Sequence, residues 1–147
     1  MTYSPILAPV VALVAWTLVM WIWLYATRLP AMRRAGISLK GRVGTRGSAL
    51  DGVLDDKVQW KAHNYNHLLE QPTLFYAIAI TLALIGGGGI WINVWLAWAY
   101  VALRIVHSLI QATVNVVHWR FAAFALATFC LLGLTVHAAA MMILHSH

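Results

Sequence analysis

The chain has 147 residues, of which 62% are hydrophobic and 10% are charged, with a mean hydropathy of +0.76. A soluble domain of this length cannot hide so much apolar surface, so lipid must be the solvent for much of the chain. The net charge of +6 does not indicate nucleic-acid binding, because eight of the ten Lys and Arg lie within residues 28–61, beside hydrophobic segments.

Four segments are long and apolar enough to be membrane-spanning helices, at approximately residues 5–28, 55–86, 90–118 and 119–144. A basic, glycine-containing loop over 29–54 separates the first two. The GGGG run at 86–89 leaves a very short turn, so the second and third helices must be antiparallel neighbours. The sequence therefore predicts one all-α membrane domain over residues 1–147, built as a four-transmembrane-helix bundle.

The positive charges predict the orientation of this multi-pass protein. Basic loops stay in the cytoplasm, so we expect 29–54 to be cytoplasmic and both termini to lie on the non-cytoplasmic side. Trp60 and Trp119 then fall at the cytoplasmic interface, and Trp91 and Trp95 near the opposite one, as an aromatic belt requires. We expect the setting to be a bacterial inner membrane.

Polar residues recur at helical spacing in the two middle segments. On the second, steps of three and four residues place one set on a single face: His63, Asn66, His67 and Glu70. The third carries a matching set: Arg104, His107 or Ser108, Gln111, Asn115 and His118. Two such faces, open toward the basic loop, predict a wet cleft that suits a small polyanionic ligand.

Glu70 and Arg104 are expected to form an ion pair inside the membrane. At about 1.5 Å of rise per residue, Glu70 lies roughly 20 Å from the cytoplasmic start of its helix, and Arg104 lies about 24 Å from the cytoplasmic end of the next. A lone charge in lipid is costly, so opposite charges at similar depth should be partners.

Other interpretations of these residues remain open. Buried polar side chains can serve to hold helices together, and an arginine near the interface, such as Arg120, can anchor lipid headgroups. A membrane glutamate also fits a small proton-coupled transporter, although a long basic loop and a matching arginine are not typical of one. A haem protein is a further alternative, with two axial ligands drawn from His63, His67, His107 and His118.

Two stretches resemble the MAPEG family, the membrane-associated proteins in eicosanoid and glutathione metabolism. They are NHLLEQPTLFY at 66–76 and RIVHSLIQATVNVVHWRF at 104–121. The resemblance extends over the whole chain in its length, its four spans and its basic first loop. It implies a homotrimer that binds glutathione between neighbouring subunits near the cytoplasmic face, and a microsomal glutathione transferase-like activity on small hydrophobic molecules.

The resemblance also implies roles for individual residues. Glu70 matches the glutamate that holds the amino group of glutathione, and Arg120 matches the catalytic arginine that lowers the pKa of its thiol. The expected glutathione-binding set is completed by other residues of the two polar faces: His63, Asn66, His67, Arg104, His107 and Gln111. No metal is required.

The chain departs from the family pattern after the arginine of the last helix. A tyrosine or serine is common there, whereas this chain has Phe121 and Phe124. A catalytically silent MAPEG-like subunit is therefore an alternative to a transferase or peroxidase. The sequence does not decide between conjugation, peroxide reduction and isomerisation.

Overall fold

The computed structural model describes residues 3–38, 40–41 and 43–144, and every regular element in these ranges is helical. Four stretches are long and apolar enough to cross a membrane, with α2 and α3 together forming the second. The predicted all-α membrane fold is thereby confirmed. In chain order the elements are α1 (Leu7–Arg34), η1 (Gly47–Leu50), α2 (Asp56–Leu68), α3 (Gln71–Leu84), η2 (Gly87–Gly89), α4 (Trp91–Thr113) and α5 (Val117–Leu144).

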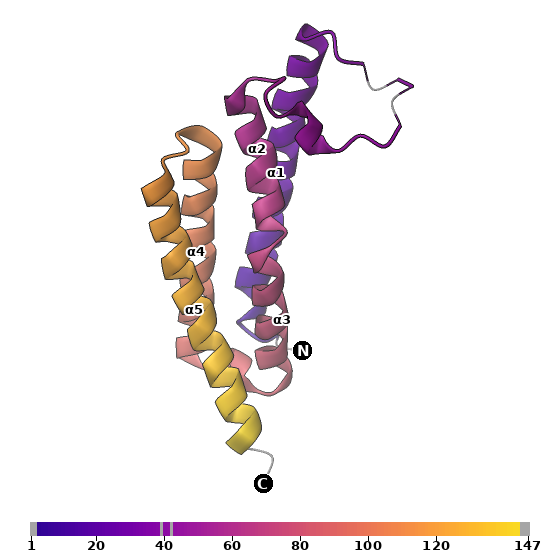
Figure 1. Ribbon diagram of the computed structural model, residues 1–147. Coiled ribbons are helices and arrows are strands. Elements are labelled where there is room, and N and C mark those ends of the chain that lie inside the picture. The colour runs from indigo at the N-terminus through magenta and orange to yellow at the C-terminus, as the bar shows by residue number, and fades with distance from the viewer. Residues whose placement is uncertain (1–2, 39, 42, 145–147) are drawn as a thin grey trace.

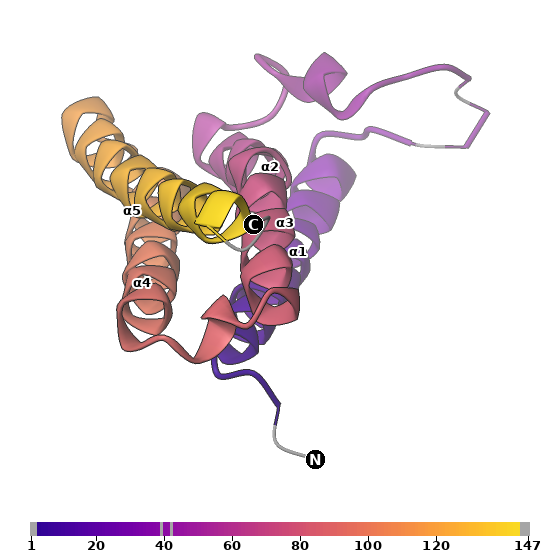
Figure 2. The same cartoon turned by 90° about the horizontal axis from the view of Figure 1, so that it is seen from below.

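The four spans run alternately up and down (Figure 1). α1 packs against α2, α3 and α4, whereas α5 packs mainly along α4 and also touches α3. The α1–α2 loop and the α4–α5 turn lie at one end of the bundle, and the beginning of α1, the end of α5 and the glycine turn lie toward the other (Figure 1). Figure 2, seen along the bundle, shows α5 crossing obliquely over it.

The first two spans differ from their expected boundaries. α1 continues through Pro30 to Arg34 rather than ending near residue 28, and Arg33 and Arg34 in its last turn complement the negative end of the helix dipole. The second span begins at α2, where the carboxylate of Asp55 accepts a hydrogen bond from the backbone N–H of Lys57 at 2.8 Å. It is not one continuous helix, because it is interrupted between Leu68 and Gln71.

The turn between the last two spans is also placed differently. We expected the third helix to reach residue 118, but α4 ends at Thr113 and α5 begins at Val117. Asn115 causes the change of direction, since its φ of 50° lies in the left-handed region that asparagine tolerates better than most residues. The turn therefore falls within the predicted polar face of the third helix.

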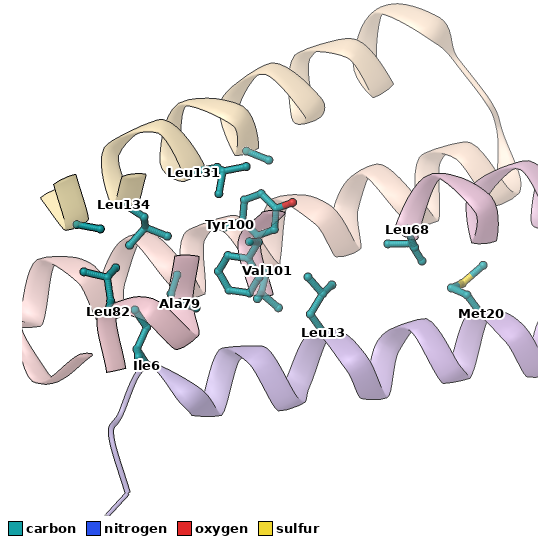
Figure 3. Packing of buried hydrophobic residues seen from close by; sticks show 14 of the residues in the cluster. Ile6, Leu13, Met20, Leu68, Ala79, Leu82, Tyr100, Val101, Leu131 and Leu134 are labelled. Carbon is teal, nitrogen blue, oxygen red and sulfur yellow. The ribbon is translucent and has the colours of Figure 1, made fainter. Parts of the chain in front are cut away.

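The core consists of apolar side chains drawn from all four spans (Figure 3). Phe75 and Tyr100 stack at its centre, with ring centroids 4.4 Å apart. At the far end, the backbone N–H of Ile6 donates to the carbonyl of Gly88 at 3.1 Å, which ties the N-terminal segment to the glycine turn. A Cβ at Gly88 would clash with the hydroxyl oxygen of Ser4 and lie 2.9 Å from the Cα of Ala83, so this close approach requires glycine.

Candidate functional site

The polar face of α2 is open in the single protomer. The side chains of His63, Asn66 and Glu70 are exposed, and His67 is half-buried beside α5. His63 and Asn66 share one face of α2, as the periodicity of the sequence predicted, and they line the same cavity. His67 lines a different cavity, and Glu70 lies in the turn after α2. His63, Asn66 and Glu70 are therefore accessible to a ligand or to another subunit.

The expected direct ion pair between Glu70 and Arg104 is wrong. Within residues 3–38, 40–41 and 43–144 the structure contains no ion pair between them. The Glu70 carboxylate instead lies 3.0 Å from Nδ1 of His67, and Arg104 donates from Nη2 to the backbone carbonyl of His67 at 3.0 Å. The prediction assumed a straight helix, whereas the interruption at Leu69 and Glu70 leaves 69% of the Glu70 side chain exposed.

The polar residues of α4 lie inside the bundle. His107 and Gln111 are 2% and 7% exposed, and Nε2 of His107 lies 3.1 Å from Oε1 of Gln111. Nδ1 of His107 donates to the backbone carbonyl of Arg120 at 2.9 Å. His107 thus joins α4 to the first turn of α5 and fixes the backbone from which the Arg120 side chain leaves.

Arg120 is half-buried beside a cavity of about 270 Å³ on the α5 side of α2. One guanidinium nitrogen of Arg120 donates to the side-chain oxygen of Asn115. The ring of His67 stacks on Phe124 at 5.5 Å and meets His107 edge-on at 4.9 Å. The cavity therefore combines one cation and two imidazoles with an apolar wall; its lining is His67, His107, Val117, Arg120, Phe121 and Phe124.

A second cavity, of about 370 Å³, lies on the α1 side of α2. His63 and Asn66 contribute to it from α2, while Arg28 comes from α1 and Arg46 from the basic loop. Arg28 donates to the backbone carbonyl of Gly47, which holds η1 against the end of α1. Charged and amide side chains from α1, α2 and the basic loop therefore line one cavity.

An acidic residue organises the wall of this second cavity. Asp51 accepts a hydrogen bond from the amide of Gln59, and its carboxylate lies 3.1 Å from Nε2 of His63. These bonds, first that from Gln59 and then that from His63, hold the pKa of the Asp51 carboxyl below its usual range. The loop is thus joined to α2 through a charged side chain at neutral pH.

Four charged or amide residues of this cavity lie outside the candidate set that the sequence predicted. Arg28, Arg46, Asp51 and Gln59 were absent from the expected set. The clustered positive charges of the loop were a signal, but they do not show which arginine turns toward α2. In the described part of this loop, which extends sideways from the bundle in Figure 1, η1 is the one regular element, so no periodicity indicates where its side chains point.

The family model described as MAPEG family matches residues 6–140 of this sequence. The chain belongs to the MAPEG family. No curated protein and no solved structure matches it significantly. The MAPEG match extends over all four membrane spans, to residue 140 within α5, and it includes the residues that line both cavities.

Membership of the MAPEG family indicates activity only at the level of the family. The family includes glutathione transferases and peroxidases together with other members. It is generally associated with glutathione, and four apolar helices agree with a multi-pass protein of a lipid bilayer.

Proposed function

We propose that this protein is a membrane-embedded, glutathione-dependent transferase or peroxidase that acts on small hydrophobic electrophiles. The observation that carries the proposal is the position of Arg120, half-buried beside a cavity whose remaining wall is largely apolar. In this assignment Arg120 stabilises the glutathione thiolate, and the polar face of α2 binds the peptide.

The cavity on the α1 side suits the charged part of the tripeptide. Glutathione carries two carboxylates and one ammonium group at neutral pH. Arg28 and Arg46 offer planar donors to the carboxylates, and Asn66 and His63 add hydrogen bonds. The exposed carboxylate of Glu70 is available to the ammonium group. No metal takes part in this binding.

We propose a homotrimer, in which a neighbouring subunit covers the ligand that a single protomer would leave exposed. The α2 face between the two cavities is exposed, and a thin bundle of this kind cannot bury a ligand against it alone. A neighbouring copy that presents α5 to this face would bring its own Arg120 toward the sulfur of a glutathione held by His63, Asn66 and Glu70. The site would then be completed by two subunits.

The chemistry at Arg120 needs only charge stabilisation. A thiol is a poor nucleophile because little of it is ionised near neutral pH. A guanidinium beside the sulfur in a site of low dielectric constant favours the thiolate, and the thiol proton leaves to solvent. In conjugation, the sulfur then forms a bond to the electrophilic carbon while the leaving group departs with its electron pair.

Val117, Phe121 and Phe124 supply the apolar wall beside this arginine. The Phe121 side chain is 67% exposed in the protomer, on a helix expected to face lipid. A hydrophobic electrophile dissolved in the bilayer can therefore reach the cavity laterally, which explains why the enzyme would be embedded in a membrane. Cavity walls of this kind favour aromatic or aliphatic substrates over charged ones.

One observation favours a second candidate, a catalytically silent membrane subunit. Among its described lining residues, the Arg120 cavity contains no hydroxyl-bearing side chain, so a hydroxyl that could assist the thiol is missing. Turnover of a generic aryl halide with glutathione distinguishes the two. Measurable conjugation by the purified protein supports the enzyme, whereas glutathione binding without turnover supports the silent subunit.

We also propose an orientation of the protein in the membrane. The basic loop lies in the cytoplasm of a bacterial cell and both termini lie on the other side of the inner membrane, so glutathione enters from the cytoplasm. Isothermal calorimetry in detergent tests the binding step. Saturable binding of glutathione, weakened in a variant that lacks Arg28 and Arg46, is expected; absence of binding by the intact protein would refute the function.

A further inference from the structure

The second membrane span contains a helix C-terminus in its interior. α2 ends at Leu68 and α3 begins at Gln71, with Leu69 and Glu70 in the turn between them. Pro72 has no backbone N–H, so it cannot donate to the carbonyl of Leu68, four residues earlier. Within the turn, the backbone N–H of Leu69 donates to the carbonyl of Asn66 at 2.9 Å, and that of Glu70 donates to the carbonyl of His67 at a longer 3.4 Å. These carbonyls form the negative end of the α2 dipole, where a further donor or a cation is favourable.

Arg104 supplies such a donor. Its side chain is fully buried, at 0% exposure, and its Nη2 donates to the carbonyl of His67 at 3.0 Å. Its guanidinium carbon also lies 5.9 Å from the ring centroid of Phe124. The cation is therefore placed at the end of α2 that electrostatics favours, between that helix and α5.

Arg104 is bound to the backbone rather than to an acid. Nε and Nη1 of Arg104 are buried without a hydrogen-bond partner in the described part of the chain. A buried charge at this depth costs free energy, so we expect Arg104 to form a contact that an apolar side chain could not form. That contact is the hydrogen bond to the backbone carbonyl of His67.

His67 connects Glu70 to the cavity that contains Arg120. Its imidazole contacts the Glu70 carboxylate at 3.0 Å and stacks on Phe124, and it lines the cavity that contains Arg120. The directions in which the side chains of His67 and Glu70 point depend on the backbone geometry of the turn between α2 and α3. A residue that holds the His67 carbonyl consequently sets the spacing between Glu70 and the Arg120 cavity.

We propose that Arg104 is a positioning residue, which caps the C-terminus of α2 and thereby orients His67 and Glu70, and that it does not touch the ligand. This inference rests on the proposed function, because it assigns Arg104 to the support of that glutathione site. It also replaces the ligand role that the family resemblance implied for this residue. A ligand arginine must offer an accessible N–H, and the side chain of Arg104 is inaccessible before any neighbouring subunit adds further cover.

Hydrogen exchange of the full-length protein in detergent, without glutathione, tests the capping role. Arg104→Met removes the donor and the charge, so exchange across residues 69–73 should accelerate by about tenfold or more, while residues 91–97 of α4 keep their wild-type rate. Arg104→Lys retains a charge and a donor and should stay close to wild type. Arg120→Met is the matched control, and it should leave residues 69–73 unchanged.

Two results would overturn the capping role. One is wild-type exchange at residues 69–73 in Arg104→Met, and the other is equal acceleration in every helix. A measurement on the unmodified protein covers the case in which Arg104→Met does not fold. With 15N-arginine labelling, addition of glutathione should shift the side-chain signal of Arg120 and leave that of Arg104 in place; an equal shift of both would show that Arg104 is a ligand.

Failure of the proposed function has a different signature. If glutathione moves no arginine signal and calorimetry detects no binding, the glutathione site is wrong, and hydrogen exchange still decides the capping role alone. If glutathione binds, Arg104→Met should weaken its affinity by about tenfold or more. At saturating glutathione that variant should still show the thiolate absorbance of the wild type, because Arg120 is intact.

Discussion

Arg120 and Asn115 are joined across the turn between α4 and α5, where the guanidinium donates to the side-chain oxygen of Asn115. The same asparagine has a φ of 50° and so makes the turn possible. Asn115 therefore both adopts the backbone conformation of the turn and orients Arg120, the proposed catalytic group. The two contributions can be separated by substitution.

Asn115→Gly should lower turnover without loss of stability, because glycine accepts a positive φ but offers no oxygen to Arg120. Asn115→Ala should lower turnover to a similar extent and also destabilise the protein by about 1 kcal/mol, since alanine is strained in the left-handed region. Conjugation rates and thermal unfolding of both variants check this. Equal stability of the two variants would show that the turn does not depend on Asn115.

Gly88→Ala should destabilise the end of the bundle at which the glycine turn packs against the beginning of α1. The new Cβ would lie 2.8 Å from the Ile6 side chain and 2.9 Å from the Cα of Ala83, so the packing must shift at a cost of about 1–3 kcal/mol. Gly89→Ala is the matched control, since a Cβ there meets nothing within 4 Å. Thermal unfolding should separate the two, and a similar melting temperature for both would contradict the close packing at Gly88.

The attachment of the loop through Asp51 should depend on pH. Its pKa is lowered in the folded state, so the attachment is complete above the usual carboxyl pKa and is lost as the pH falls through the lowered value. Gln59→Leu removes the larger cause of the lowering, and release of the loop should then begin at a higher pH. Hydrogen exchange of residues 47–51 between pH 3 and pH 7, values that bracket an ordinary carboxyl pKa of about 4, measures this release. An unchanged profile in Gln59→Leu would show that the bond does not hold the loop.

Glu70→Gln should reduce glutathione affinity but hardly change stability. The carboxylate is 69% exposed and contacts His67 rather than Arg104, and exposed pairs contribute about 1 kcal/mol or less. Calorimetry and thermal unfolding of the variant measure the two effects. A stability loss of about 3–5 kcal/mol would instead indicate the buried ion pair that the structure lacks.

The error over Glu70 and Arg104 shows which features the sequence can predict here. Hydrophobic length and three-to-four-residue spacing are local properties, so they predicted the four spans and the shared face of His63 and Asn66. The expectation that Glu70 and Arg104 lie at the same depth assumed a straight second helix. Pro72 has no backbone N–H, so it already indicated that one backbone hydrogen bond of that helix would be missing. The contact between Arg28 and the carbonyl of Gly47 lies in a loop without periodicity, so no pattern in the sequence predicted it.

The ultraviolet absorbance of bound glutathione thiolate tests the central claim, that Arg120 activates the thiol, most directly. The purified wild type should show this absorbance near neutral pH. Arg120→Lys should lose it, because a point charge does not replace the planar donors, while glutathione affinity stays within about tenfold. Turnover in Arg120→Lys should fall much further than the affinity. Full thiolate absorbance and turnover in Arg120→Lys, or no thiolate in glutathione-bound wild type, would contradict the assignment.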